Sequence, residues 1–464
     1  MMVRRLFPIA ALSLALALGG CGLPIAHTDA GLDLPATWQA PATPAAVAVD
    51  ADWWRGFGSP ELAGLVETAR AGSFDVAAAV ARVRQADALA RMAGAALLPE
   101  VDGTAGAERT KVVGYPALTS YTVGLSASYE LDIWGGTRAA RQAAVDTLAA
   151  TAYAHDAVLL TLTAGVADTY LQTLALRERV AIARQNLATG ERILAFVESQ
   201  YRAGAATALD LAQQRGLVAS LRQTVAQRDQ QARDSLTALA VLIGRAPQGF
   251  DVGNTTLEAL ALPTVSACVP ADLLVRRPDV AQAERQLATA DADVTVARAA
   301  MLPSLTLTAS AGVGNDRLAG LFDHPIYDLA AGIAAPIFNA GRLAAGRDLA
   351  LAQREELLAD YRKAIVAALG DVETALNAID GVDRQQQAQD EALTQAQAAV
   401  RLAESRYRAG AETLLTLLDA QRTLYDAQDQ AVQLRLARLQ ASVALYKALG
   451  GGWRLGADTA RRTS

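Results

Sequence analysis

The sequence predicts an α+β membrane protein with an internal tandem duplication, in which several copies of the chain share one β-barrel that is continued by long helices. Three observations lead to this fold class: landmark motifs recur in two halves of the chain, strand-like alternation appears in both halves, and a very long helix-prone stretch follows each. Apolar residues make up 52% of the 464 residues and charged residues 19%. This balance supports a packed core and excludes wholesale disorder.

The N-terminal segment has the features of a bacterial export signal. Arg4 and Arg5 precede an apolar run from Leu6 to Leu18, and its roughly 13 residues are too few for a transmembrane helix of about 20. The sequence Leu18-Gly19-Gly20-Cys21 resembles the lipobox of bacterial lipoproteins. The resemblance implies that Cys21 is acylated and, with Gly rather than Asp next to it, that the protein is sorted to the outer membrane. An ordinary signal peptide with an incidental cysteine is the alternative.

An internal duplication organises the rest of the chain. The segment Asp75-Val76-Ala77 returns as Asp279-Val280-Ala281, 204 residues later. A second match, Glu198 to Gly204 against Glu404 to Gly410, is shifted by 206 residues. We therefore expect two repeats rather than independent domains. The predicted segments are a signal peptide, a lipidated segment, a first repeat, a second repeat and a tail, at 1–20, 21–58, 59–262, 263–456 and 457–464.

Each repeat begins with a helical stretch, expected at 60–97 and 278–301, and then changes to a period of two. In the second repeat, apolar residues alternate with Thr, Ser and Gly from Leu305 to Val313. In the first repeat, a similar alternation runs from Tyr121 to Leu131. Such half-buried strands have about the 9–11-residue length of tilted membrane strands. Two hairpins at duplicated positions favour a membrane barrel over the edge of a soluble sandwich.

A very long helix is expected after each hairpin, over 138–203 and 342–409. Both stretches are poor in Pro and rich in Ala, Leu, Gln, Arg and Glu. At 1.5 Å per residue, each would reach roughly 100 Å, which no compact domain of this mass can house. Return helices are expected over 207–244 and 413–449. A seven-residue spacing predicts coiled-coil packing, and its positions in the first copy are Val180, Leu187, Leu194 and Tyr201.

The four candidate strands of one chain cannot close a barrel by themselves. Outer-membrane barrels begin at eight strands. An open edge in lipid leaves backbone groups without partners, at a cost of several kcal/mol each. Several copies of the chain must therefore share one barrel, which makes the assembly a pore.

The chain resembles the outer-membrane factor family of TolC-like channels, in particular its NodT/OprM-type lipoprotein branch. The motifs that carry the resemblance are the lipobox, Asp52-Trp53-Trp54, Arg276-Arg277-Pro278-Asp279, Tyr407-Arg408-Ala409-Gly410, Leu417 to Arg422 and Leu445 to Trp453. The resemblance implies a homotrimer in which each chain gives four strands to a shared outer-membrane β-barrel and its helices to a long periplasmic α-helical barrel. It also implies a periplasmic adaptor (membrane fusion) protein and an inner-membrane transporter of the resistance-nodulation-division type as partners.

The function that the resemblance implies is passive export of drugs or other small molecules, in a tripartite efflux system of a Gram-negative bacterium. The exit duct of type I protein secretion, metal-ion efflux and a structural envelope lipoprotein are the alternatives. The three histidines are far apart and Gly312-x-Gly314 lacks a third glycine, so no enzyme activity, metal or cofactor is expected. The net charge of −6 argues against a nucleic-acid partner. With Cys21 acylated, Cys268 has no disulfide partner.

Two candidate sites are expected near the turns between the long helices. Glycine there permits a left-handed backbone and the close approach of a partner. The resemblance implies adaptor docking at these tips, at Gly204, Ala205, Thr207, Gly410, Ala411 and Thr413. A plain helix–helix turn is the alternative.

The second candidate site is a periplasmic gate. Leu415, Asp419 and Arg422 are spaced by four and three residues, which places them on one face of the second return helix. The resemblance implies that these residues form the closing constriction of the channel. A surface ion pair is the alternative.

Overall fold

The structure, a computed structural model, describes residues 23–40, 50–254, 256–263 and 270–453. The predicted lipid anchor, Cys21, and the second cysteine, Cys268, lie outside the described residues. Within these residues, no helix combines the length and apolarity needed to cross a membrane. The chain separates into two compact units. The first consists of residues 1–32, 81–153 and 282–364, and the second of residues 33–80, 154–281 and 365–464.

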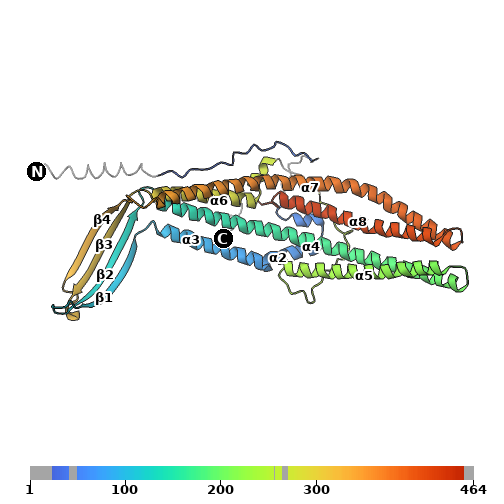
Figure 1. Cartoon of the computed structure of the whole chain (residues 1–464), viewed down its shortest axis with the longest axis horizontal. Coiled ribbons are helices and arrows are strands. Elements are labelled where there is room, and N and C mark those ends of the chain that lie inside the picture. Colours follow the sequence, from blue (N-terminus) through green and yellow to red (C-terminus); the bar gives the residue numbers. More distant parts are fainter. Residues whose placement is uncertain (1–22, 41–49, 255, 264–269, 454–464) are drawn as a thin grey trace. The chain divides into compact units, whose positions relative to one another are not determined.

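The first unit holds a four-stranded antiparallel sheet (Figure 1). Its strands, in spatial order, are β1 (Glu100–Thr110), β2 (Leu118–Leu131), β3 (Ser304–Asn315) and β4 (Pro325–Ala334). The two hairpins come from the two repeats and join where Leu125 of β2 faces Ala311 of β3. Among the described residues, the outer edges of β1 and β4 pair with no other strand. The sheet of one chain is therefore open on both sides.

The register gives the sheet one apolar and one polar face. One row across the four strands consists of Val101, Ala127, Ala309 and Leu329. The next row, on the opposite face, consists of Asp102, Ser126, Ser310 and Asp328. Leu329 is 83% exposed and Tyr327, on the same face, is 78% exposed. A sheet with lipid on one side and water on the other has this pattern.

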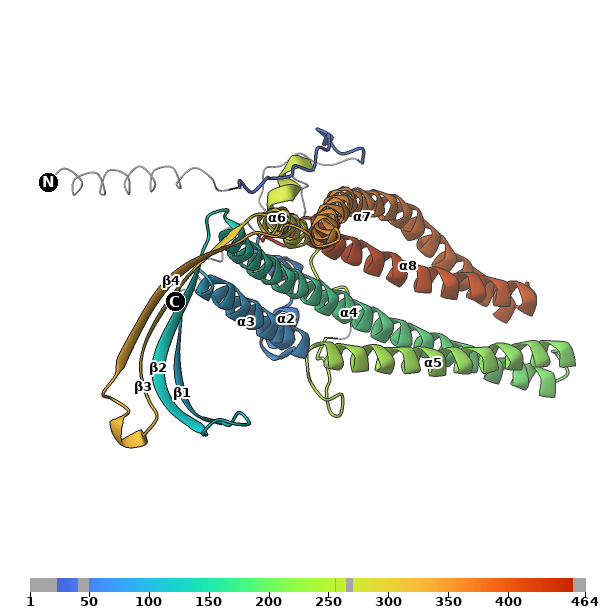
Figure 2. The same cartoon turned by 60° about the vertical axis from the view of Figure 1, so that its left-hand side comes forward.

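The long helices of the two repeats have the same lengths. Helices α4 (Gly136–Arg202) and α7 (Arg342–Arg408) each span 67 residues, and their return helices α5 (Ala208–Leu242) and α8 (Leu414–Ala448) each span 35. Each long helix turns back along its return helix (Figure 2). All four predicted helices are confirmed to within two residues at each end. Corresponding residues of these hairpins are 206 positions apart.

The helix expected over 60–97 is instead two helices, α2 (Pro60–Gly72) and α3 (Phe74–Ala95). Between them, Ser73 has an extended backbone, with φ −68° and ψ 129°. Glycine and serine are weak helix formers that favour such breaks, and the Ser73 carbonyl accepts the amide of Ala77 at the start of α3. The helix expected over 278–301 is α6 (Pro278–Ala299).

The Arg276-Arg277-Pro278-Asp279 motif begins α6 and ties three helices together. The buried guanidinium of Arg277 donates to Asp279 at 2.7 Å, to Asp371 of α7 at 2.9 Å and to the carbonyl of Ala448 of α8 at 3.2 Å. Gly450, with φ 86°, follows α8 and passes the carbonyl of Arg276 so closely that a Cβ would lie 1.8 Å from it. The Arg276-Arg277-Pro278-Asp279 motif and the motif from Leu445 to Trp453 therefore contact each other at the end of α8.

Candidate functional site: the helical tips

The two tips have the same backbone conformation in both repeats. The long helix ends at a glycine with a left-handed backbone, with φ 74° at Gly204 and 72° at Gly410. The amide of the next residue, Ala205 or Ala411, donates to the carbonyl five residues earlier, at 2.8 Å and 2.9 Å. This is a Schellman-type helix end, which glycine favours because it has no Cβ. The predicted glycine turns are confirmed in both copies.

The return helices begin with different caps. On α5, Thr207 Oγ1 accepts the amide of Asp210 at 3.1 Å, and Asp210 Oδ2 accepts the amide of Thr207 at 2.9 Å, which forms a capping box. On α8, Thr413 Oγ1 accepts the amide of Thr416 at 3.3 Å. The amide of Thr413 and the hydroxyl of Thr416 donate to Glu412 and hold the pKa of its carboxyl below the usual value. Both tips are therefore fixed by local hydrogen bonds.

Both tips present open surface. A Cβ at Gly204 or Gly410 would meet no atom of the described chain within 4 Å. The first turn of each return helix also exposes a leucine, Leu209 by 65% and Leu415 by 57%. Leu209 is not among the predicted site residues, although its offset of 206 from Leu415 could have identified it. The other predicted tip residues are exposed as well: Ala205, Thr207, Ala411 and Thr413.

The predicted gate residues lie together on α8. Arg422 Nη1 is 3.7 Å from Asp419 Oδ1, and these side chains are 70% and 63% exposed. Such a pair contributes at most a few tenths of a kcal/mol within one chain. The residues 206 positions earlier are Leu209, Gln213 and Gly216. The charged pair is therefore a property of the second repeat alone, and the nearby Asp210 of the first repeat belongs to the capping box instead.

Comparison with known proteins identifies the family. The family model described as outer membrane efflux protein matches residues 65–245 and 269–451. The chain belongs to the outer membrane efflux protein family. It is 53% identical over 455 residues to the pyoverdine export outer membrane protein OpmQ of Pseudomonas aeruginosa, a match that covers 95% of this chain and 96% of the relative. The solvent efflux pump outer membrane protein SrpC of Pseudomonas putida is 36% identical over 406 residues, covering 86% of each chain.

A solved relative shows the same fold. The open state of the Neisseria gonorrhoeae MtrE outer membrane channel superposes with a TM-score of 0.84 and 29% identity, covering 93% of this chain and 98% of that one. The predicted family, fold class and function are confirmed: the protein is an outer-membrane efflux channel, and in TolC-like channels three chains assemble. Channels of this family lie in the Gram-negative outer membrane and work with an adaptor and an inner-membrane pump.

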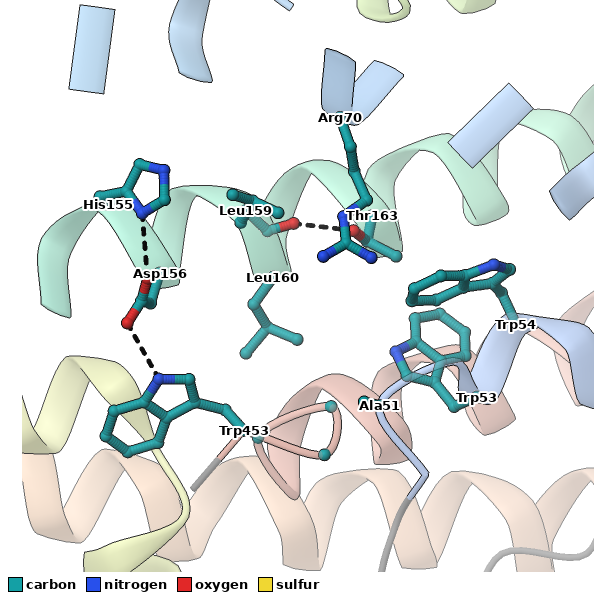
Figure 3. Close-up of a pocket in the computed structure, with 13 residues that line it drawn as sticks. Ala51, Trp53, Trp54, Arg70, His155, Asp156, Leu159, Leu160, Thr163 and Trp453 are labelled. Carbon is teal, nitrogen blue, oxygen red and sulfur yellow. Dashed lines mark hydrogen bonds and ion pairs between the residues drawn. The ribbon is translucent and has the colours of Figure 1, made fainter. Parts of the chain in front are cut away.

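Two motifs that are far apart in the efflux protein's sequence meet in a pocket of about 360 Å³ (Figure 3). Trp53, from the segment before α2, stacks on Tyr446 of α8 with ring centroids 4.9 Å apart. Trp453, after α8, donates from Nε1 to Asp156 Oδ2 at 3.0 Å. These aromatic residues therefore hold the segment before α2 against α8 and the segment after α8 against α4.

The same pocket contains a histidine–aspartate pair. His155 Nδ1 lies 2.9 Å from Asp156 Oδ1, and the hydroxyl of Thr163 donates to the carbonyl of Leu159 at 2.8 Å (Figure 3). Nucleophilic catalysis requires a hydroxyl or thiol in hydrogen-bond reach of the base. The described residues that line this pocket do not form that pair, and in the described part of the chain no group of three or more His, Cys, Asp or Glu could hold a metal ion.

The carboxyl group of Asp168, on α4, has among the described residues a buried oxygen without a partner and a raised pKa. It lines a second pocket, of about 660 Å³, and its Oδ1 is buried without a hydrogen-bond partner in the described part of the chain. Burial raises the pKa of Asp168 to about 6, although the positive charge of Lys447 opposes this shift. The ordinary value is about 3.9. The contribution of Asp168 to stability is therefore complete below about pH 4 and is lost as the pH rises through about 6.

The Asp168→Asn variant removes this pH dependence. We expect its melting temperature to exceed the parent's by a few degrees at about pH 7.5 and to match it at about pH 3.5. Thermal unfolding followed by circular dichroism at both pH values measures the difference. Asp234→Asn, an exposed carboxylate of the same pocket, is the matched control and should follow the parent. An equal shift of Asp168→Asn at both pH values would contradict the assignment.

Proposed function

We propose that three copies of this chain form the passive outer-membrane duct of a tripartite exporter, with no enzymatic step of its own. The open sheet is the observation that supports this assembly, because the edges of β1 and β4 need partners in lipid. Four strands from each of three chains give a barrel within the known size range. Native mass measurement in detergent and conductance in planar bilayers test the proposal. A conducting three-chain particle is expected, and a monomer that does not conduct would overturn it.

The cargo that we propose is pyoverdine or a molecule of its class. The relative named for pyoverdine export is 53% identical, whereas the relative named for solvent efflux is 36% identical. The test introduces this chain into Pseudomonas aeruginosa lacking OpmQ and measures pyoverdine in the medium by its fluorescence. Restored export is the expected result. If pyoverdine export stays at the level of the strain lacking OpmQ while growth in solvent improves, the second candidate is favoured, an efflux channel for solvents and drugs.

We propose two partners, a periplasmic adaptor and an inner-membrane transporter. A periplasmic adaptor docks on the tips at Gly204 and Gly410, and an inner-membrane transporter of the resistance-nodulation-division type delivers the cargo. The fixed backbone and exposed surface of both tips support docking there. Leu415, Asp419 and Arg422 form the closing constriction, and their common exposure on α8 supports this assignment.

Cys21 is the proposed lipid anchor after removal of residues 1–20. Each acyl CH₂ that enters the membrane contributes about 0.8 kcal/mol, so the Cys21→Ser variant is expected to lose its fatty-acid label and to fall several-fold in the outer-membrane fraction. Labelling with radioactive palmitate and membrane fractionation measure both effects. Cys268→Ser is the matched control and should label like the parent. Equal labelling of Cys21→Ser and the parent would refute the lipobox interpretation.

A further inference from the structure

A pocket of about 420 Å³ lies in the first compact unit, near the points where β3 and α7 begin. Its lining combines apolar side chains with two guanidinium groups. The lining comes from the N-terminal segment, from the end of α6 and its link to β3, and from α7, and it contains no carboxylate of the described chain. The lining residues are Leu23, Arg298, Met301, Leu302, Arg347 and Leu351.

The neighbouring chain segments place this pocket at the periplasmic surface of the outer membrane. Leu302 comes two residues before Ser304, where β3 begins, and this end of the strand is the one that is joined to a long helical region. Another lining residue, Leu23, follows the proposed lipid anchor, Cys21, by two residues. The amide of Leu23 donates to the carbonyl of Trp134 at 3.0 Å. This bond holds the N-terminal segment beside the end of β2.

The same end of the sheet carries exposed apolar side chains. Ile337 and Phe338, in the link from β4 to α7, are 92% and 89% exposed. Trp134, in the link from β2 to α4, donates from its indole nitrogen to the carbonyl of Pro303 at 2.6 Å. Aromatic and large apolar residues of this kind gather where the hydrocarbon of a membrane meets water. The pocket therefore lies at the level of the lipid headgroups.

The two guanidinium groups of the pocket carry more charge than the chain neutralises. Arg347 forms an ion pair with Asp348 at 2.8 Å through Nε and Nη2, which leaves its Nη1 donors. Arg298, at the end of α6, is exposed and forms no ion pair in the described part of the chain. Guanidinium groups bind phosphate through paired, charge-assisted hydrogen bonds. The pocket therefore offers a phosphate group one unneutralised guanidinium and part of a second.

The first repeat does not have this pair of arginines. The residue 204 positions before Arg298 is Gly94, and the residue 206 positions before Arg347 is Arg141. A Cβ at Gly94 would lie 3.7 Å from Arg141 Nε, so the two positions are neighbours in the first repeat as well. The second arginine is therefore particular to the repeat whose pocket is lined by Leu23.

We propose that this pocket binds one phospholipid with an anionic headgroup, from the periplasmic leaflet of the outer membrane. Its phosphate binds Arg298 and Arg347. One of its acyl chains lies along Met301, Leu302 and Leu351. The inference rests on the outer-membrane location in the proposed function and adds a lipid ligand to it. The single excess positive charge matches phosphatidylglycerol, which carries one negative charge, whereas the ammonium group of phosphatidylethanolamine would meet two guanidiniums.

Native mass spectrometry of the whole protein in detergent tests this site. The washed protein is titrated with dioleoyl-phosphatidylglycerol or with dioleoyl-phosphatidylethanolamine, and the bound lipid is counted. Phosphatidylglycerol is expected to saturate at one molecule per chain and to bind about tenfold more tightly than phosphatidylethanolamine. Arg298→Gln should lower phosphatidylglycerol binding by about tenfold, and Arg347→Gln should lower it too. Arg141→Gln, the counterpart in the first repeat, is the matched control and should bind like the parent.

The other possible occupants give different results. Equal binding of the two lipids, or parental binding by both Arg298→Gln and Arg347→Gln, would overturn the site. Displacement of the lipid by inorganic phosphate would mean that free phosphate is the ligand, and uptake of phosphatidylglycerol by Cys21→Ser but not by the parent would mean that the chain's own acyl group fills the pocket. Either result would overturn the proposal. A conducting trimer that binds no added lipid would overturn the lipid site alone, whereas a monomer that does not conduct would overturn the proposed duct.

Discussion

Replacing Gly410 with tryptophan is expected to reduce export by more than tenfold while the protein still reaches the outer membrane as a folded trimer. Gly410 has φ 72°, and a Cβ there would point into open space. A left-handed backbone costs a residue with a side chain about 1–2 kcal/mol, and the added side chain would displace no atom of the described chain. The indole ring would then stand where the adaptor must approach. The same result is expected for Gly204→Trp at the first tip.

Export of pyoverdine into the medium, together with trimer content of the outer membrane, measures this effect. Gly410→Ala carries the same backbone strain without the bulk and should export like the parent. Gly114→Trp is a second control, because Gly114 also has a positive φ, of 91°, and no described atom within 4 Å of its Cβ position, but lies in the loop between β1 and β2. Parental export by both tip variants would show that the tips are ordinary turns.

The sequence alone predicted the long helices well because two independent signals agreed there. Both stretches contain no proline, and the seven-residue spacing extends to Tyr201. A Cβ at Gly190 would lie 2.9 Å from Leu221 of α5, so the small residue permits close approach of α4 and α5. The first strand gave a weaker signal, because its apolar face is built from small residues such as Ala105 and Ala107. Its position follows instead from the duplication.

The sequence could not predict which copy of a repeated residue is buried. Tyr201 and Tyr407 occur in the same motif, yet they are 44% and 9% exposed, because Tyr407 packs against Phe196 of α4. The hydrogen-bond partners of Arg277 could not be predicted either, since Asp371 and Ala448 belong to helices far along the chain. The local sequence pattern predicts where a helix begins, ends and turns. Contacts between helices depend on how one helix is aligned along another, which hydrophobic periodicity and helix propensity do not determine.

Removing the charges of the proposed gate is expected to raise conductance several-fold. A channel that stood open at rest would leak the periplasm, and the second repeat differs from the first by the charged pair of Asp419 and Arg422. The pair is exposed, with the two charged groups 3.7 Å apart, so it adds little to the stability of one chain. In a trimer the same residues repeat around one axis. Three carboxylates and three guanidiniums would then attract one another at close range, with Leu415 narrowing the opening beside them.

The double variant Asp419→Ala with Arg422→Ala tests this arrangement because it removes the charges without touching the core of α8. Single-channel conductance and uptake of a large antibiotic that the parent excludes should both rise. Gln213→Ala with Gly216→Ala, at the corresponding positions of α5, is the matched control, and its conductance should stay at the parental level because that copy carries no charge pair. An unchanged conductance of a correctly inserted Asp419→Ala, Arg422→Ala trimer would place the constriction elsewhere. An equal rise in both double variants would mean that loosening either return helix opens the channel, independent of charge.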